Sequence, residues 1–304
     1  MKVHAILALK ADHRLAVAGI ARSTFFYHQA RVARPDPASA LHEAIRTAFT
    51  QAKGRYGHRR IHRELVKTGW RVAKKTVLTR MRQLGLVCRV RRRKRFTTYR
   101  GEIGTTAPNH LNRAFTATAP NQQWVTDVTE FRIGDDRLYL SPVMDLFDRR
   151  IIAATVGRSP NLNLTTTALR TAIGMLRPGE QPLVHSDQGF QYQHASWRNL
   201  LATAGAIPSM SHKGNCLDNA VIESFFGHLK TELLLDPFIC IAALETALHE
   251  YITWYNHDRT SATLKGLSPV QYRTQALMTE TSLYPVHLSG SSSSSVRGVS
   301  VSIR

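Results

Sequence analysis

The sequence predicts an α/β domain that follows an all-α, basic region. Charge is divided unevenly along the chain, because residues 1–120 hold 26 Lys and Arg against 5 Asp and Glu, whereas residues 121–304 hold 15 against 16. Hydrophobic residues recur at helical spacing up to residue 88 and alternate as in strands from residue 122 onward. A basic helical part and a nearly neutral mixed part predict two domains with separate tasks.

The chain as a whole is strongly basic. Its 304 residues carry a formal net charge of +20, and the sequence pI is about 10.6. Such a charge predicts a polyanionic partner, of which nucleic acid is the commonest. The hydrophobic content of 43% is ordinary for a globular protein, so we expect a packed core.

Nothing at the start of the chain predicts export or membrane insertion. The first 21 residues are mildly apolar, but Lys10, Asp12 and Arg14 interrupt them, so we expect neither a signal peptide nor a membrane span. The cysteines are few, odd in number and far apart, at Cys88, Cys216 and Cys240. This pattern predicts no disulfide framework and no cysteine zinc site, and it favours the cytoplasm.

The first elements are expected to be helical. Residues 1–34 are predicted as a helical segment that is broken at Gly19, with Ser23 as the N-cap of its second part. A proline-containing linker is predicted at 35–40, and a compact helical domain over 41–88.

Within residues 41–88, two short helices surround a glycine turn. Ile61 and Leu65 lie one turn apart on the first of them, and Gly69 marks the turn. The second helix has a hydrophobic stripe that consists of Val77, Met81 and Leu84. Two short helices around a turn are typical of a helix-turn-helix, whose second helix enters a major groove of DNA.

The other faces of that second helix are basic. Lys74, Lys75 and Arg80 are the predicted DNA contacts there, although a small helical domain with a solvated basic face has the same pattern. Residues 89–120 are predicted as a basic linker, and seven of the twelve residues at 89–100 are Lys or Arg. Arg91, Arg92 and Arg93 are candidates to contact phosphates, and the alternative is a merely solvated charge run.

Residues 121–278 are predicted to alternate strands and helices. Three strands come first, at Gln123–Ile133, Arg137–Leu146 and Arg149–Val156. The elements that follow are a helix at Thr165–Leu176, a strand at Pro182–Ser186, a helix at Ala195–Ala204, a strand at Ile207–Met210, and helices at Asn219–Leu235 and Ile241–His257. Periodicity alone predicts only α/β, but this order of elements is that of the ribonuclease-H-like fold. Residues 279–304 are a serine-rich tail, predicted to be disordered.

Three acids of this domain are candidates for a metal site. Asp127 lies within the first predicted strand, Asp187 ends the fourth, and Glu223 is one turn into a helix. Taken singly, they also fit a buried structural acid, a turn residue and an ordinary helix carboxylate. Taken together, they suit phosphoryl transfer at a DNA backbone, in which two Mg²⁺ ions roughly 3.5–4 Å apart activate the attacking oxygen and neutralise the leaving oxygen.

Other residues of the domain have simpler interpretations. Asp145 and Asp148 are expected to pair with the neighbouring Arg149 and Arg150. Trp124 is expected in the core, with a platform on which a DNA base stacks as the alternative, and His185 either touches the site or supports its strand. Asp218 is a rival for the third carboxylate, although it stands at the mouth of the helix that carries Glu223.

Several motifs agree in order and spacing with a known family. Thirty-five residues separate Asp187 from Glu223. The motifs are Trp-Val-Thr-Asp at 124–127, His-Ser-Asp-Gln-Gly at 185–189, Gly-Asn-Cys-Leu-Asp-Asn at 214–219, Glu-Ser-Phe-Phe at 223–226, Tyr-Asn-His at 255–257, Leu-Lys-Gly-Leu-Ser-Pro at 264–269 and Tyr-Gly-His-Arg-Arg-Ile at 56–61. Over about residues 50–275, the chain resembles insertion-sequence transposases with a DDE integrase catalytic core. It is most similar to the downstream-frame product of the two-frame group related to retroviral integrases.

The resemblance implies a fold, a cofactor and an activity. The fold would be a retroviral-integrase-like, ribonuclease-H-like core, and Asp127, Asp187 and Glu223 would hold two Mg²⁺ ions, for which Mn²⁺ can substitute. Cleavage at the element end and strand transfer would proceed through a circular intermediate. Lys230 lies seven residues after Glu223, on the same helical face, and matches a basic residue that contacts DNA. Asn219 is a second candidate DNA contact or a helix cap.

The resemblance also implies partners. DNA, as element ends and target, is the main one, and an upstream-frame protein with a zipper and a helix-turn-helix is another, since this chain has no evident leucine-zipper heptad. We expect a homo-oligomer on DNA, in the bacterial cytoplasm on the nucleoid, with no membrane association. Two alternatives remain: a ribonuclease-H-like nuclease that does not join DNA, and a catalytically inactive DNA-binding regulator.

Overall fold

The computed structural model describes residues 38–88, 106–212, 216–233 and 238–283, with a few single residues between 23 and 30. The chain divides into two compact units, residues 1–92 and residues 93–304, and each is described by itself. The predicted helical segment 1–34, Arg91 to Arg93 and the end of the serine-rich tail fall largely or wholly outside the described residues.

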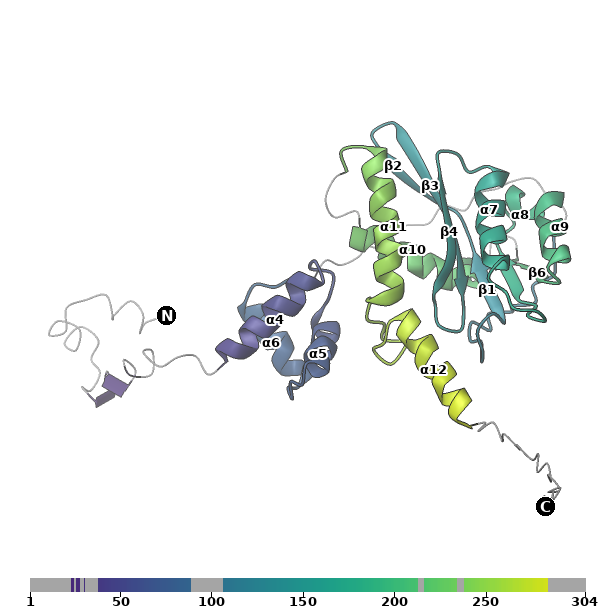
Figure 1. The fold of residues 1–304 in the computed structure, drawn as a ribbon. Helices are drawn as coiled ribbons and strands as arrows, with labels where there is room; N and C mark the ends of the chain where they lie inside the picture. The colour runs from purple at the N-terminus through teal and green to yellow at the C-terminus, as the bar shows by residue number, and fades with distance from the viewer. Residues whose placement is uncertain are drawn as a thin grey trace, which may run out of the picture. The chain divides into compact units, whose positions relative to one another are not determined.

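Within its described residues 38–88, the N-terminal unit forms the helices α4 (Ser39–Gln51), α5 (His58–Lys67) and α6 (Lys74–Gln83) (Figure 1). Its core consists of apolar side chains that recur at helical spacing, and among them Ile45, Ile61, Leu65, Val77 and Met81 are at most 3% exposed. Gly69 has a φ of +89°, a left-handed conformation that glycine adopts without strain, and it turns the chain from α5 towards α6. The predicted two-helix motif is thus present. The helix before it, α4, begins at Ser39 and so includes the last two residues of the predicted linker 35–40.

The C-terminal unit is built on one mixed sheet. Its strands are β1 (Gln123–Thr126), β2 (Thr129–Ile133), β3 (Asp136–Asp145), β4 (Ile151–Gly157), β5 (Leu183–Ser186) and β6 (Ile207–Met210). The hydrogen-bonded order is β2-β3-β1-β5-β6, and β4 pairs with the other edge of β3. The pairs that involve β3 are antiparallel, whereas β1 with β5 and β5 with β6 are parallel.

The first predicted strand, Gln123–Ile133, is interrupted at Asp127 and Val128. Both halves keep one register along β3, since Thr126 faces Val143 and Thr129 faces Leu140. At the break, the carboxylate of Asp127 accepts the backbone N–H of Val128 at 2.7 Å, so this donor is engaged locally. Pro142 lies at the same level of β3 and has no N–H to donate. Asp127 therefore stands at the end of a strand and not, as its sequence position indicates, in the middle of one.

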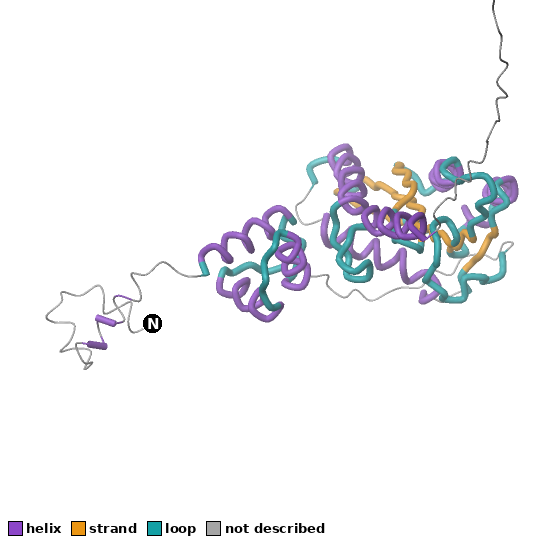
Figure 2. The backbone as a smooth tube through the Cα atoms, turned by 60° about the horizontal axis from the view of Figure 1, so that its bottom comes forward, coloured by secondary structure: helices purple, strands orange, loops and turns teal. Residues whose placement is uncertain are grey.

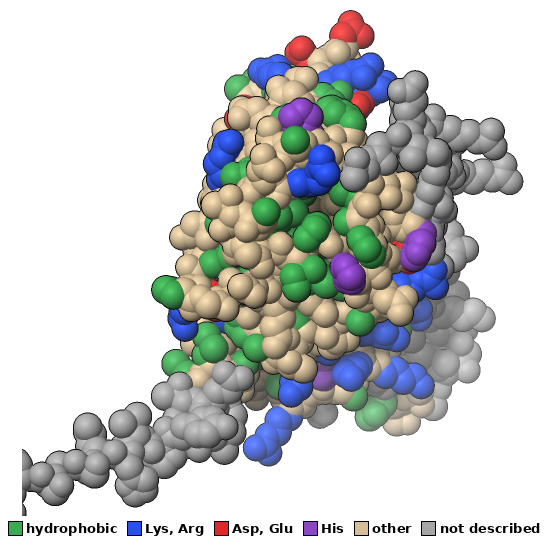
Figure 3. Space-filling model, turned by 90° about the vertical axis from the view of Figure 1, so that its right-hand side faces the viewer, with side chains coloured by type: hydrophobic (Ala, Val, Ile, Leu, Met, Phe, Trp, Pro, Cys, Tyr) green, Lys and Arg blue, Asp and Glu red, His purple; other side chains and the backbone are tan. Residues whose placement is uncertain are grey.

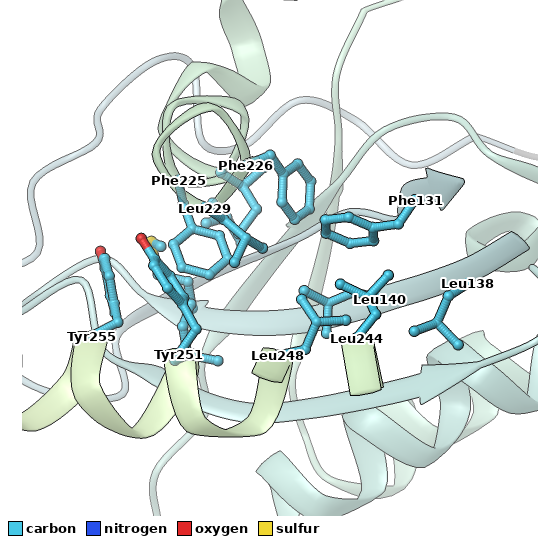
Figure 4. Packing of buried hydrophobic residues seen from close by; sticks show 14 of the residues in the cluster. Phe131, Leu138, Leu140, Phe225, Phe226, Leu229, Leu244, Leu248, Tyr251 and Tyr255 are labelled. Atoms are coloured by element: carbon cyan, nitrogen blue, oxygen red, sulfur yellow. The ribbon is translucent and has the colours of Figure 1, made fainter. Parts of the chain in front are cut away.

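Helices cover both faces of the sheet (Figures 1 and 2). One face packs against α7 (Leu162–Ile173), α8 (Phe190–Gln193) and α9 (Ala195–Thr203), and Trp124 belongs to that layer. The other face packs against α10 (Ala220–Leu233) and α11 (Ile241–His257), and Val125 belongs to this one. Figure 4 shows Phe225 of α10 beside Tyr251 and Tyr255 of α11, and Phe226 beside Phe131 of β2. Adjacent residues of β1 thus point to opposite faces, as a strand requires.

Two further elements complete the unit. A 3-10 turn, η1 (Cys216–Asn219), precedes α10, where a single α-helix from Asn219 was predicted. The last helix, α12 (Pro269–Leu283), extends past the predicted start of the tail at residue 279. Arg273 of α12 forms ion pairs with both Asp145 and Asp148, so these acids have the structural role that was expected. Their side-chain ion pairs are with this distant arginine and not with Arg149 and Arg150. Of the two neighbours, Arg150 donates its backbone N–H to Oδ1 of Asp148 at 2.9 Å, whereas Nη2 of Arg149 donates to the carbonyl of Phe115 at 2.7 Å.

On the face shown in Figure 3, hydrophobic side chains lie singly among polar ones. Among the described helices, none is both long enough and apolar enough to cross a lipid bilayer.

Candidate active site

Asp127 and Asp187 occupy equivalent positions on neighbouring parallel strands. β1 ends at Thr126 and β5 ends at Ser186, so each aspartate is the first residue after its strand. The strands are in register, with Val125 opposite His185. Because both chains run in the same direction, the two carboxylates leave the sheet at the same edge, and both side chains are half-buried there.

Backbone groups hold both carboxylates. Oδ1 of Asp127 accepts the N–H of Val128 at 2.7 Å, and Oδ1 of Asp187 accepts the N–H of Gly189 at 2.9 Å. Gly189 has a second role, because a Cβ atom built on it would lie 3.0 Å from that same oxygen and 2.9 Å from Oε1 of Gln191. A larger residue at this position would require the carboxylate of Asp187 or the amide of Gln191 to shift. This glycine was part of the sequence motif, but no role was assigned to it there.

Glu223 and Lys230 both lie on α10 and are half-buried. The helix packs on β1 and on the hydrophobic cluster that contains Ile222 and Phe225. Seven residues, two turns, separate Glu223 from Lys230, so the two share one side of the helix. The ammonium of Lys230 also lies 5.3 Å from the centroid of the Phe131 ring, a cation–π contact that holds it over the sheet.

The charges of Asp187, Glu223 and Lys230 all affect the pKa of Asp127. Burial raises the pKa of Asp127 well above its ordinary value, and the negative charges of Asp187 and Glu223 raise it further, whereas the N–H of Val128 and the ammonium of Lys230 lower it. Burial likewise raises the pKa of Asp187, against the hydrogen bond from Gly189. The structure therefore brings Asp187, Glu223 and Lys230 within electrostatic reach of Asp127.

The carboxylates do not form a closed ligand cage. In the part of the chain that the structure describes, no three side chains of His, Cys, Asp or Glu stand close enough together to enclose a metal ion. Carboxylates that repel one another at a half-buried edge nevertheless fit a hard divalent cation, because such a cation prefers oxygen ligands, keeps several waters and relieves the repulsion.

Tyr192 is a neighbour of the site that sequence reasoning missed. It is 1% exposed, and its hydroxyl lies beside the buried hydroxyls of Thr126 and Ser141, although none of the three has a partner at full hydrogen-bond geometry among the described residues. Its pKa is raised well above the ordinary value by burial and by the charges of Asp127 and Asp187. Its place in the short helix after Gly189 brings it there, and no periodicity marks so short an element.

Two residues with alternative interpretations are now placed. Trp124 is fully buried in the core, as expected. His185 is also fully buried, and its ring nitrogens bond to Oγ of Ser209 at 2.9 Å and Oγ of Ser211 at 3.0 Å. Burial lowers the pKa of His185 to about 4, so the ring is neutral. His185 supports its strand by linking β5 to β6 and to the residue that follows β6.

Asp218 and Asn219 precede the helix of Glu223. The carboxylate of Asp218 is occupied by Asn109, Arg113 and His212, which leaves Glu223 as the acid of this region near Asp127. Asn219 ends the 3-10 turn, so the α-helical spacing that placed it on the face of Glu223 does not apply. Its side chain is 5% exposed, and neither amide atom has a hydrogen-bond partner among the described residues.

The predicted DNA contacts of the N-terminal unit lie at both ends of α6. Lys74 and Lys75 are exposed in its first turn, and Arg80 is half-buried in its last, where Nη1 donates to Oε1 of Gln83 at 2.9 Å. The buried side of α6 carries Val77 and Met81. The hydrophobic stripe and the basic side of the helix are thus separated, as a groove-binding helix requires.

Each of the two units matches a known protein family. Residues 117–216 and 223–277 match the family described as integrase core domain, and residues 37–94 match an HTH-like domain. The putative transposase InsK of insertion sequence element IS150 from Escherichia coli is 45% identical, over 88% of this chain and 94% of that protein. An uncharacterized transposase-like protein from Haemophilus influenzae is 49% identical over 65% and 91%, and the transposase of insertion sequence element IS904 from Lactococcus lactis is 36% identical over 76% and 92%.

Proposed function

The chain belongs to the insertion-sequence transposases with an integrase core domain, and from this premise we propose that it catalyses metal-dependent cleavage and strand transfer at the ends of an insertion sequence. The observation that carries the proposal is the common edge at which Asp127 and Asp187 leave two parallel strands, with the charges of Glu223 and Lys230 directed to the same point.

The proposed cofactor is a pair of Mg²⁺ ions, for which Mn²⁺ can substitute. Asp127, Asp187 and Glu223 would hold them. When bound, the ions would supply charge neutralisation for the attacking and leaving oxygens of the phosphodiester. The raised pKa of Asp127 and of Asp187 supports this assignment, because it means that a nearby positive charge is favoured.

The chain's own residues bind and orient the DNA in this proposal. The ammonium of Lys230, held against Phe131, would contact a phosphate oxygen next to the scissile bond. Asn219 is a further candidate through its unpartnered amide. The hydrogen bonds from Val128 and Gly189 fix the two aspartates, so that their remaining oxygen lone pairs face the site without reorganisation.

The HTH-like domain implies DNA binding, and we propose α6 as the helix that enters the groove. Lys74, Lys75 and Arg80 would contact DNA from it, and Arg91, Arg92 and Arg93 would follow the backbone beyond it. We further propose a homo-oligomer on paired ends, an upstream-frame partner, and a place on the nucleoid in the bacterial cytoplasm.

The test is a joining assay on DNA with the element's terminal sequences. Asp127→Asn keeps the size of the side chain and removes its charge, so we expect DNA binding to persist while cleavage and joining are lost. Near-wild-type joining by this variant would refute the assignment.

The two alternatives give different outcomes in the same assay. A ribonuclease-H-like nuclease would cut RNA–DNA hybrid or branched DNA without joining ends. A DNA-binding regulator would bind the ends and show no cleavage that depends on Mg²⁺. The match across both integrase segments and the HTH-like domain favours the transposase.

A further inference from the structure

Asp218 is a buried carboxylate whose two oxygens are both engaged. Its side chain is 2% exposed. Oδ1 accepts Nε of Arg113 at 2.9 Å, while Oδ2 accepts Nδ2 of Asn109 at 3.0 Å and the backbone N–H of His212 at 3.1 Å. Oδ2 also lies 3.2 Å from Nδ1 of His212. Burial raises the pKa of Asp218, but the hydrogen bonds from Arg113 and His212 outweigh burial and lower it, so the group is ionised.

The partners of Asp218 are themselves fixed to the sheet. The backbone N–H groups of His110 and Leu111 donate to Oγ of Ser209 in β6, at 3.0 and 3.1 Å. Oγ of Ser209 in turn bonds to the buried ring of His185. The side chain of Leu111 is 1% exposed and belongs to the cluster that α10 covers. Residues 107–113, which we name the anchor segment, are therefore part of the rigid sheet layer.

Asp218 lies five residues before Glu223 and two before the start of α10. Ile222, the neighbour of Glu223, is fully buried in the same cluster as Leu111. The start of α10 is thus held at two points, by the ionic contact of Asp218 in the preceding 3-10 turn and by the packing of Ile222 in the first turn of the helix. A displacement of about 1 Å at a reacting centre can cost on the order of 100-fold in rate, so this fastening bears on catalysis.

We propose that Asp218 is a positioning residue, which fastens the first turn of α10 to the anchor segment and so holds Glu223 beside Asp127 and Asp187. The inference rests on the proposed metal site. In the proposed metal site, Asp218 contacts neither the metal nor the DNA and acts only through Glu223.

The experiment measures metal-induced stabilisation of the full chain, as the shift of Tm during titration with Mg²⁺ or Mn²⁺. In Asp218→Asn an NH₂ group replaces one acceptor, and the ion pair with Arg113 is lost. We expect the midpoint of the titration to rise about 10-fold, which is the usual effect of losing a group that orients a metal ligand. Arg113→Gln breaks the same contact from its half-exposed partner, so it should shift the midpoint in the same direction even if Asp218→Asn folds poorly.

A double-mutant cycle separates positioning from general destabilisation. In a Glu223→Gln background, Asp218→Asn should cause no further shift of the midpoint, because its effect passes through Glu223. An additive shift would overturn the proposal, as would an unchanged midpoint in both Asp218→Asn and Arg113→Gln.

Glu180→Gln is the matched control. Glu180 accepts Nδ2 of Asn121 at 2.9 Å and the N–H of Arg177 at 2.8 Å, but it precedes β5 and so lies at the opposite end of the sheet from Asp187. The metal-titration midpoint of Glu180→Gln should equal that of the wild type. If Glu180→Gln shifts the midpoint as much as Asp218→Asn does, the positioning role is overturned. A wild-type chain that neither ion stabilises would overturn the metal site, and the positioning role with it.

Discussion

The backbone N–H of Gly189 donates a 2.9 Å hydrogen bond to Oδ1 of Asp187, and a Cβ atom on Gly189 would lie 3.0 Å from that oxygen. One residue thus both fixes the carboxylate and leaves space for it. No larger residue can do both without moving the aspartate.

We therefore expect Gly189→Ala to reduce cleavage and joining by about 10-fold or more, because the methyl group displaces Asp187 or Gln191. The measurement is the single-turnover rate on element-end DNA. Gly134→Ala is the control, since nothing lies within 4 Å of a Cβ there although its φ is +57°. Equal rates for Gly189→Ala and the wild type would show that the close approach has no consequence.

Lys230→Gln should move the acidic limb of the pH–rate profile to higher pH. The ammonium of Lys230 lowers the pKa of Asp127, whereas burial, Asp187 and Glu223 raise it. Without the ammonium this pKa rises, so the carboxylate becomes ionised only at higher pH. Arg170→Gln, on the exposed side of α7, should leave the profile in place. A lower rate with an unshifted limb would mean that Lys230 contacts DNA without tuning Asp127.

Arg259→Ala should destabilise the C-terminal unit by about 3–5 kcal/mol, because it removes the cation that pairs with the buried carboxylate of Glu232. Nε and Nη2 of Arg259 donate to Glu232 at 2.9 and 2.8 Å, and both side chains are 6% exposed. Urea unfolding measures the loss. The exposed pair of Arg132 with Glu130 provides the comparison, since Arg132→Ala should cost at most about 1 kcal/mol. Similar losses for both variants would contradict the role of burial.

Tyr192→Phe should change the free energy of unfolding by at most about 1 kcal/mol, because the buried hydroxyl of Tyr192 meets only the hydroxyls of Thr126 and Ser141, and none of the three has a partner at full hydrogen-bond geometry. Tyr251→Phe is the matched change, and it should cost about 1.5–3 kcal/mol, since the hydroxyl of Tyr251 donates to Glu232 at 2.8 Å. If Tyr192→Phe is destabilising to a similar degree, its hydroxyl has a bound partner in solution.

Lys74→Gln combined with Lys75→Gln should weaken DNA binding in a manner that depends on salt. Each phosphate contact contributes about 0.9 to the slope of log K against log salt, so the slope should fall by about 2 if both lysines contact phosphates. Fluorescence anisotropy over a salt series measures it. Lys67→Gln is the control, because Lys67 on α5 already pairs with Glu64 at 3.1 Å. An unchanged slope in the double variant would exclude α6 as the helix that meets the DNA backbone.

The sequence by itself determined the local features of this protein. The pattern of its hydrophobic residues predicted α5, the strands from β3 to β6 and the helices α9 and α11, because the side chains that each of these segments buries are set by its own residues. The interval between Asp187 and Glu223, with its flanking motifs, predicted the family. Boundaries failed where a side chain competes with the backbone, as at Asp127, which accepts the N–H of Val128 and ends β1.

Only the tertiary structure decided which residues far apart in the sequence form ion pairs with one another. Asp218 and Glu223 are both carboxylates near one helix start, yet Asp218 is saturated by Arg113, 105 positions away. Asp145 and Asp148 pair with Arg273 rather than with the arginines beside them. An ion pair forms where the packed layers bring charges together out of water, and that position depends on the register of the whole sheet and not on distance along the chain.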